Sequence, residues 1–145
     1  MRYPKRFLIF PFLFFSLTGC LENLFPPKGS NVEMIVTGYC PCKKCCGWKR
    51  NWFGRPVYAY GKSKGKSKRV GICADGTKAL RGTIAADTKY YPFGTKMYVP
   101  GYGYGTVHDR GGSIKGPSRI DIFFRTHKQA LSWGTQKKTI IVVKN

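Results

Sequence analysis

The chain has 145 residues, which is room for one domain and little more. It carries 26 Lys and Arg residues against six Asp and Glu, a formal net charge of +20, so we expect an anionic partner or surface. Aromatic residues make up 15% of the chain and there are 18 glycines, while sustained helical periodicity is confined to residues 126–133. Together these features favour a compact all-β domain with tight turns.

The N-terminus has the pattern of an exported lipoprotein. Basic residues in the first six positions precede an apolar run at 7–17, which ends in Leu-Thr-Gly-Cys at Cys20. This run is too short for an ordinary transmembrane helix and is typical of a secretory signal, and its end resembles a bacterial lipobox with a lipidated cysteine. We therefore predict a lipoprotein signal peptide at 1–19, a flexible tether at 20–31 and a folded domain at 32–145.

A lipid anchor at Cys20 would place the domain on the exported side of the bacterial cell envelope. The anionic neighbours there are lipid head groups and cell-wall polymers, so we expect no nucleic-acid partner. The basic, Gly/Ser-rich run at 61–69 is either a solvated loop or a binding surface for such a polymer. We expect the domain to be a monomer.

Short β-branched and aromatic runs bounded by glycine and proline predict the strands. These runs lie at 32–39, 82–86, 97–99, 105–107, 120–124 and 139–143. The last run is almost unbroken in its apolar character, so we expect it to be buried on both faces. A short helix is predicted at 126–133, where Thr126 can cap the N-terminus and Gly134 can end the helix.

Asp121 is the residue that most needs an explanation. It lies within the apolar run Ile120 to Phe124, and a carboxylate in such a place is unfavourable unless it is paired or hydrogen-bonded. Asp109 follows the preceding strand and Asp87 closes an earlier one. Half of the acidic residues of the chain therefore lie in one compact β-rich segment.

Four cysteines fall within seven residues, at Cys40, Cys42, Cys45 and Cys46, and Cys73 follows. In an exported protein we favour disulfides over metal binding, with Cys73 bridging back to this group, and we expect no metal and no other cofactor. The alternative is a zinc knuckle, because the Cys-x-x-Cys spacing suits a zinc site. A thiol nucleophile is a third reading, and it would need a histidine that the sequence does not place beside a cysteine.

Several of these segments together resemble the 3D-domain proteins, a bacterial family named for three aspartates. The resemblance extends over residues 34–143 and rests on long, ordered motifs. They are Thr37-Gly38-Tyr39, Gly82 to Asp87, Pro92 to Thr95, Asp109 to Gly116, Arg119 to Phe124 and Ala130 to Gly134. It implies a small six-stranded double-psi β-barrel with one short helix and a cysteine-rich insertion, related to the barrel of membrane-bound lytic transglycosylase A.

The resemblance further implies that Asp87, Asp109 and Asp121 are the three family aspartates, with Asp121 as the catalytic acid and base. The expected activity is that of a lytic transglycosylase, which cleaves the MurNAc–GlcNAc β-1,4 bond of peptidoglycan and leaves 1,6-anhydro-MurNAc. One carboxyl group suffices for that chemistry, because the C6 hydroxyl of the sugar replaces water as the nucleophile. Burial and a neighbouring carboxylate would both raise the pKa of Asp121, as a general acid requires.

Lys115 and Arg110 are candidates for binding the glycan, and Tyr102 and Tyr104 for stacking on its sugar rings. The same residues have structural readings as well: the two cations as counter-charges for the aspartates, and the tyrosines as parts of the barrel. A non-catalytic cell-wall-binding lipoprotein, in which the aspartates are structural, is therefore the alternative function.

Overall fold

The computed structural model describes residues 28–143. The predicted signal peptide, Cys20 and most of the tether lie outside this range. Within it, the first strand begins at Gly29, three residues before the start expected from the sequence. Its first residue pairs with Val143 at the other end of the described chain. The domain therefore includes the last residues of the segment that we expected to be a tether.

Strands predominate in the described residues, and two short helices accompany them. In chain order the elements are β1 (Gly29–Tyr39), α1 (Lys43–Cys46), β2 (Trp48–Arg50), β3 (Pro56–Tyr58), β4 (Thr83–Ala85), β5 (Lys96–Val99), β6 (Gly103–Asp109), β7 (Arg119–Phe123), α2 (His127–Trp133) and β8 (Thr135–Val143).

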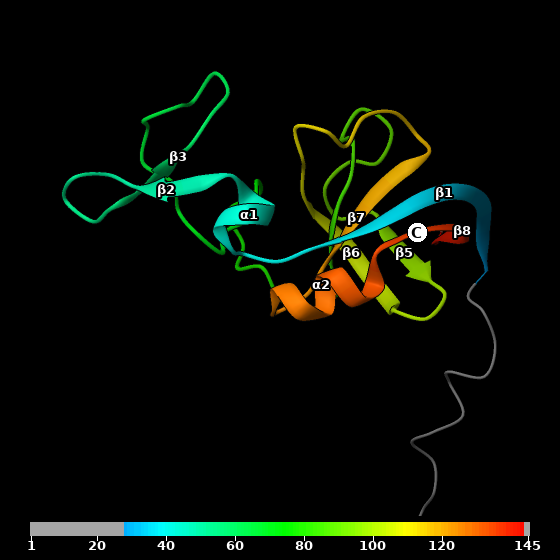
Figure 1. Ribbon diagram of the computed structural model, residues 1–145. Coiled ribbons are helices and arrows are strands. Elements are labelled where there is room, and N and C mark those ends of the chain that lie inside the picture. The colour runs from blue at the N-terminus through cyan, green and yellow to red at the C-terminus, as the bar shows by residue number, and fades with distance from the viewer. Residues whose placement is uncertain (1–27, 144–145) are drawn as a thin grey trace, which may run out of the picture.

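Six of the strands close into a barrel in the order β1-β7-β4-β6-β5-β8. The pairs β1–β7 and β4–β6 are parallel, and the other adjacent pairs are antiparallel. Parallel neighbours need long crossover connections. Here residues 40–118 connect β1 to β7, and residues 86–102 connect β4 to β6. This confirms the predicted all-β, six-stranded double-psi barrel (Figure 1).

The barrel interior is filled by the apolar side chains of every strand. In β7, Ile120 and Ile122 are fully buried in this core, which places Arg119 and Asp121 on the opposite face of the strand. The apolar neighbours of Asp121 in the sequence therefore point away from its carboxyl group. A second, smaller cluster, formed by Tyr39, Ala85 and Phe123, lies on the face that Asp121 shares.

The closing strand differs from the prediction. It starts at Thr135 rather than Thr139, and of its residues only Ile140 is fully buried. The strand pairs with β1 along its whole length and with β5 near its end, so the apolar run 139–143 lies on the barrel wall with one face partly open. Burial on both faces was therefore a wrong expectation.

The segment between β1 and β4 forms a separate lobe beside the barrel. It contains α1 and the two-stranded ribbon β2–β3, in the part of the sequence that showed no clear strand pattern (Figure 1). Trp52 and Phe53 at the ribbon tip are 95% and 81% exposed. In this lobe, here residues 40–81, the buried hydrophobic residues are Cys40, Val57 and Cys73.

The predicted short helix is confirmed as α2. Thr126 caps it with a complete capping box, in which its hydroxyl accepts from the Gln129 amide and the Gln129 side chain accepts from the Thr126 amide. Gly134, with φ of 66°, ends the helix. In the described part of the chain, neither helix is long and apolar enough to cross a membrane.

Candidate functional site

The barrel sets two of the three aspartates in one row across its strands. Asp121 on β7 is opposite Ala85 on β4, and Ala85 is in turn opposite Asp109 on β6. Thr37 on β1 continues the row on the other side of Asp121. Two strand spacings of about 4.8 Å separate the backbones of the aspartates, with only the methyl group of Ala85 between them.

A β-bulge produces this alignment. The register between β4 and β6 shifts after the pair Ile84 and Val107, so that Ala85 pairs with Asp109 in place of His108. Bulges commonly re-aim side chains beside functional sites. Without the bulge, Ala85 would pair with His108, and Asp109 would lie one position further along β6. We did not predict this register shift from the sequence.

One oxygen of the Asp121 carboxyl group is buried without a hydrogen-bond partner. Among the described residues, no hydrogen-bond donor contacts its Oδ1 atom, which is closed to solvent. Burial raises the pKa of Asp121 to about 6, and the Asp109 carboxylate adds to the rise, while the Thr37 hydroxyl and the Arg119 guanidinium oppose it. Asp121 can therefore hold and release a proton near neutral pH.

Asp109 has the opposite environment. Its Oδ1 accepts hydrogen bonds from the backbone amides of Ala74 and Arg110, at 3.1 and 2.9 Å, and its Oδ2 accepts one from the Tyr39 hydroxyl at 3.2 Å. Burial and the Asp109 carboxylate raise the pKa of Tyr39, so this phenol remains a donor. The three donors hold the Asp109 carboxyl group in a fixed position beside Asp121.

The third aspartate, Asp87, organises a loop. Its carboxylate accepts hydrogen bonds from the amides of Gly116 and Lys89, at 2.9 and 3.2 Å. These two bonds, with the nearby charge of Lys115, lower the pKa of Asp87. Asp87 therefore pins the connection between β6 and β7, and the exposed Lys115 lies on that same connection.

The expected glycan-binding residues lie in different environments. Arg110 is exposed next to Asp109. Tyr104 is 49% exposed and packs edge-on against Tyr98. Tyr102 is in the barrel interior instead: it is 5% exposed, and its hydroxyl donates to the Phe123 carbonyl and accepts from the Gly82 amide. Its ring is therefore not available for stacking on a sugar.

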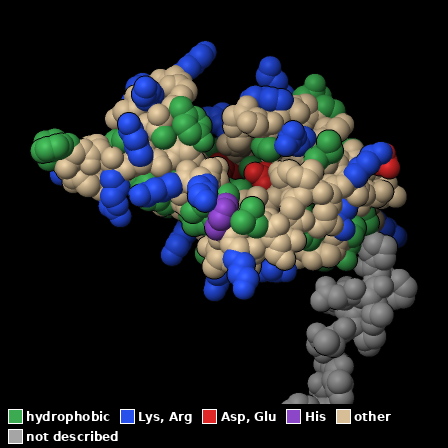
Figure 2. All heavy atoms as spheres, viewed as in Figure 1, with side chains coloured by type: hydrophobic (Ala, Val, Ile, Leu, Met, Phe, Trp, Pro, Cys, Tyr) green, Lys and Arg blue, Asp and Glu red, His purple; other side chains and the backbone are tan. Residues whose placement is uncertain are grey.

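Two hollows flank the row of aspartates. Figure 2 shows acidic side chains at the bottom of a recess between the lobe and the barrel, with Lys and Arg side chains around the rim. A second, open hollow of about 750 Å³ lies along the outer face of β6 and is lined by Tyr104, Thr106 and His108 together with Lys78 and Arg81. The Asp75 carboxylate contacts His108 Nδ1 at 2.6 Å, and the amide of the neighbouring Ala74 donates a hydrogen bond to Asp109. The loop that carries Ala74 and Asp75 therefore borders both the recess and the open hollow.

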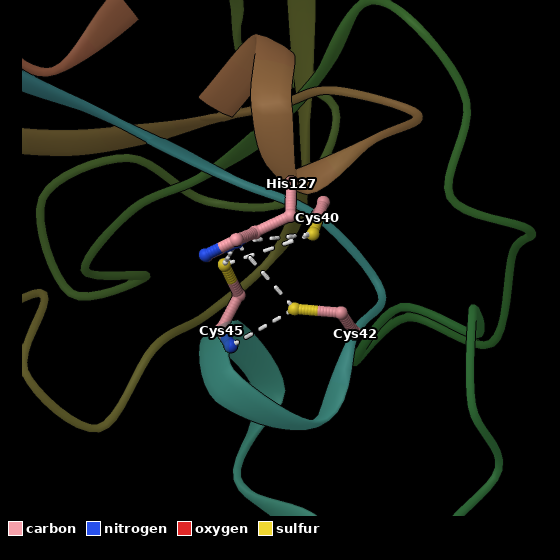
Figure 3. Close-up of side chains that lie close together, drawn as sticks. All are labelled: Cys40, Cys42, Cys45 and His127. Carbon is pink, nitrogen blue, oxygen red and sulfur yellow. Dashed lines mark hydrogen bonds between the residues drawn. The ribbon is translucent and has the colours of Figure 1, made fainter. Parts of the chain in front are cut away.

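The cysteines do not form the predicted disulfides. All five described cysteines are free, and the Cys40 and Cys45 sulfurs are 3.7 Å apart, whereas a covalent S–S bond is about 2.05 Å. Three of these thiols, those of Cys40, Cys42 and Cys45, instead surround Nδ1 of His127 at the start of α2 (Figure 3). The sequence did not indicate this contact, because His127 lies more than 80 residues from the cysteines.

The fold and this row define a small closed β-barrel with an acidic site built across its strands. Residues 82–144 match the 3D domain, which confirms the predicted resemblance for this part of the chain. The matched segment starts just before β4, so β1 and the cysteine-rich lobe lie outside it.

Two relatives from Bacillus subtilis (strain 168) align over 60 residues, which is 41% of this chain. The cell wall-binding protein YocH is 42% identical, and the aligned part is 21% of its length. The putative cell wall shaping protein YabE is 40% identical over 14% of its length. The similarity therefore spans about a fifth or less of either relative.

Proposed function

We propose that the domain is a peptidoglycan lytic transglycosylase in which Asp121 acts first as acid and then as base. One observation carries this proposal: the carboxyl group of Asp121 is buried, has no partner on Oδ1 and has its pKa raised to about 6. A carboxyl group whose only purpose is structural would gain stability from a donor, as Asp87 and Asp109 do. Catalytic acids are commonly found in such destabilised states.

The reaction needs one proton carrier. Protonated Asp121 gives its proton to the oxygen that links C1 of MurNAc to GlcNAc, and the C1–O bond breaks as positive charge develops on the MurNAc ring. The C6 hydroxyl of the same sugar then attacks C1 and releases its proton to the Asp121 carboxylate. The products are a GlcNAc end and a 1,6-anhydro-MurNAc end, the acid is restored, and no water is consumed.

Asp109 would support this step as a fixed negative charge. Its carboxylate is held by the Ala74 and Arg110 amides and the Tyr39 hydroxyl, and it lies in the same row as Asp121. A carboxylate there favours the protonated form of Asp121 and stabilises the positive charge that develops on the sugar. Its preorganisation makes the interaction stronger than a mobile side chain would provide.

A non-catalytic cell-wall-binding role is the second candidate. It is favoured by the name of one relative, a cell wall-binding protein, and by the excess of Lys and Arg on the surface (Figure 2). The exposed Trp52 and Phe53 at the ribbon tip offer flat rings that suit sugar faces. In this role Asp121 would be dispensable.

The deciding experiment is mass spectrometry of the fragments released when the full chain, purified in detergent, is incubated with sacculi. We expect fragments that end in 1,6-anhydro-MurNAc, one water lighter than hydrolysed fragments. Hydrated ends would indicate a hydrolase. If the folded chain binds sacculi but releases no fragments, the result would contradict the enzymatic proposal and favour the binding role.

We also propose that the domain is held at the membrane by lipidation of Cys20, which lies outside the described residues. The basic start, the apolar run and the Leu-Thr-Gly-Cys end support this. Fractionation of cells that produce the chain or its Cys20→Ser variant is the test. The unchanged chain should stay with the membrane and the variant should not, and equal distribution of the two would contradict the proposal.

A further inference from the structure

We infer that Cys40, Cys42, Cys45 and His127 form a structural zinc site that joins the lobe to the barrel. The four donor atoms all lie within 4.8 Å of one another. They come from two distant parts of the chain, since the cysteines surround the start of α1 and the histidine is the first residue of α2. Figure 3 shows the three sulfurs and the ring nitrogen turned toward a common centre.

The distances match tetrahedral zinc. With Zn–S of about 2.3 Å and Zn–N of about 2.05 Å, tetrahedral angles require S···N separations of about 3.6 Å and S···S separations of about 3.8 Å. The distances from His127 Nδ1 to the sulfurs of Cys45, Cys42 and Cys40 are 3.4, 3.6 and 3.9 Å. The Cys40 and Cys45 sulfurs are 3.7 Å apart. One ion at the centre would satisfy all of these distances at once.

Local hydrogen bonds and helix caps support the positions of the donors. The Cys45 amide donates to the Cys42 sulfur at 3.4 Å, and Gly47, with φ of 55°, ends the single turn of α1. The Trp48 ring nitrogen donates to the Pro41 carbonyl at 2.9 Å, which fixes the turn from outside. On the other side, the capping box at Thr126 fixes the first residue of α2. Amide donors to the ligands are typical of metal sites.

The donor set selects the ion. Three thiolates and one imidazole suit zinc and make a closed, four-coordinate site, which is the form that structural zinc takes. Binding releases the three thiol protons to solvent and leaves a site of net charge −1, because three thiolates, one Zn²⁺ and a neutral imidazole combine. Lys43 and Lys44 lie between the ligands in sequence and supply compensating positive charge.

The number of sulfurs around His127 also distinguishes this site from that of a nucleophilic cysteine. A thiol–histidine pair needs one sulfur on the ring nitrogen, and here three sulfurs share it. Cys46 provides the internal contrast. Its thiol donates to the Cys40 carbonyl at 3.1 Å and does not join the cluster, although it lies next to Cys45 in the sequence.

The experiment uses the full chain, purified in detergent without added metal or chelator. Elemental analysis should find one zinc per chain. Exchange with Co²⁺ should give the strong visible d–d bands of a tetrahedral site and the near-ultraviolet bands of cobalt–thiolate bonds. Less than stoichiometric metal together with a cobalt spectrum of octahedral type would overturn the inference, and so would a Cys40–Cys45 disulfide in the peptide map.

Variants test the assignment of the ligands. His127→Ala and Cys42→Ser should each lower zinc affinity by at least about 100-fold, since loss of even an outer partner of a ligand costs 10–100-fold. Cys46→Ser, the matched control, should keep both the zinc and the cobalt spectrum. His127→Cys should restore zinc binding with an all-sulfur cobalt spectrum. Equal loss of zinc in Cys46→Ser and Cys42→Ser would contradict the ligand set.

Discussion

The barrel and the lobe are stabilised by different means. The barrel has a continuous interior in which residues such as Met97, Val107 and Ile140 are fully buried. The lobe has almost no interior of its own, and its ribbon ends in the exposed Trp52 and Phe53. A small unit without a core needs a disulfide, a metal or a partner surface to stay ordered. The cysteine–histidine cluster lies where the lobe meets the barrel and can supply this stabilisation.

The two regions also differ in whether their polar side chains have partners. On the barrel, Asp121 is left without a partner on Oδ1, which destabilises the fold and provides a proton near neutral pH. In the cluster, each donor atom faces the others and would be satisfied by one ion. Adjacent residues link the two places, because Tyr39 bonds Asp109 and Cys40 belongs to the cluster. We therefore expect changes in the barrel site to affect activity and changes in the cluster to affect local order.

The largest effect should follow from Asp121→Asn, which keeps the size of the side chain and removes its titrating proton. General acid–base catalysis typically contributes about 10²–10⁴-fold, so the release of anhydro-fragments should fall by that factor while the circular dichroism spectrum stays unchanged. The activity of the unchanged chain should decrease as pH rises above about 6, because Asp121 then loses its proton. Activity retained in the variant would remove Asp121 from the mechanism.

The same substitution should change stability in a pH-dependent way. The pKa of Asp121 is about 6 in the folded chain against an ordinary 3.8, so the folded state binds this proton more tightly and stability falls as pH rises from about 4 to 6. Above that range the penalty reaches up to about 3 kcal/mol. Asp121→Asn should therefore be the more stable protein at pH 8, and the difference should vanish below about pH 4.

Urea unfolding of both proteins at several pH values measures this difference. Glu33→Gln is the matched control, because Glu33 is an exposed carboxylate whose partner is Lys137 at 2.8 Å. Its replacement should change stability by less than about 1 kcal/mol. If Asp121→Asn is the less stable protein at pH 8, its carboxylate has a partner that balances its burial.

Removal of metal should loosen the lobe and spare the barrel. With a strong chelator, hydrogen exchange at the Cys45 and Cys46 amides should accelerate by at least about 100-fold, because their turn depends on the cluster. The amides of Ile35 and Ile120 in the paired strands β1 and β7 should change little. Equal acceleration in both regions would show that lobe and barrel unfold as one unit.

The smallest effect should come from the basic loop of the lobe. Replacing Lys62, Lys64, Lys66, Lys68 and Arg69 with Gln should weaken binding to sacculi several-fold, because each exposed ion pair contributes about 0–1 kcal/mol. Binding of the unchanged chain should also weaken as salt shortens the Debye length from about 10 Å at 0.1 M to about 3 Å at 1 M. Lys96→Gln with Lys137→Gln on the barrel is the comparison, and an equal loss per charge removed would assign binding to total charge.

The sequence by itself determined the elements that depend on neighbouring residues. Short β-branched and aromatic runs bounded by glycine and proline predicted all six barrel strands, five of them to within a few positions, and the Thr126 and Gly134 signals predicted α2. Asp121 could be singled out because a carboxylate within an apolar run is unfavourable unless it is paired or hydrogen-bonded. The structure then showed that the isoleucines beside it point to the opposite face of the strand. The lobe strands β2 and β3 were missed, since their sequences, Trp-Lys-Arg and Pro-Val-Tyr, do not form a β-branched and aromatic run.

Only the tertiary structure decided which groups meet. The bulge at Ala85 brings Asp109 into the row of Asp121, and α2 carries His127 to cysteines more than 80 residues away. The structure also showed that Tyr102 lies in the core and that the five described cysteines form no disulfide bonds. Spacing along a chain restricts contacts over a few residues, whereas strand order, register and packing set the contacts between distant segments, and both sites are built from such contacts.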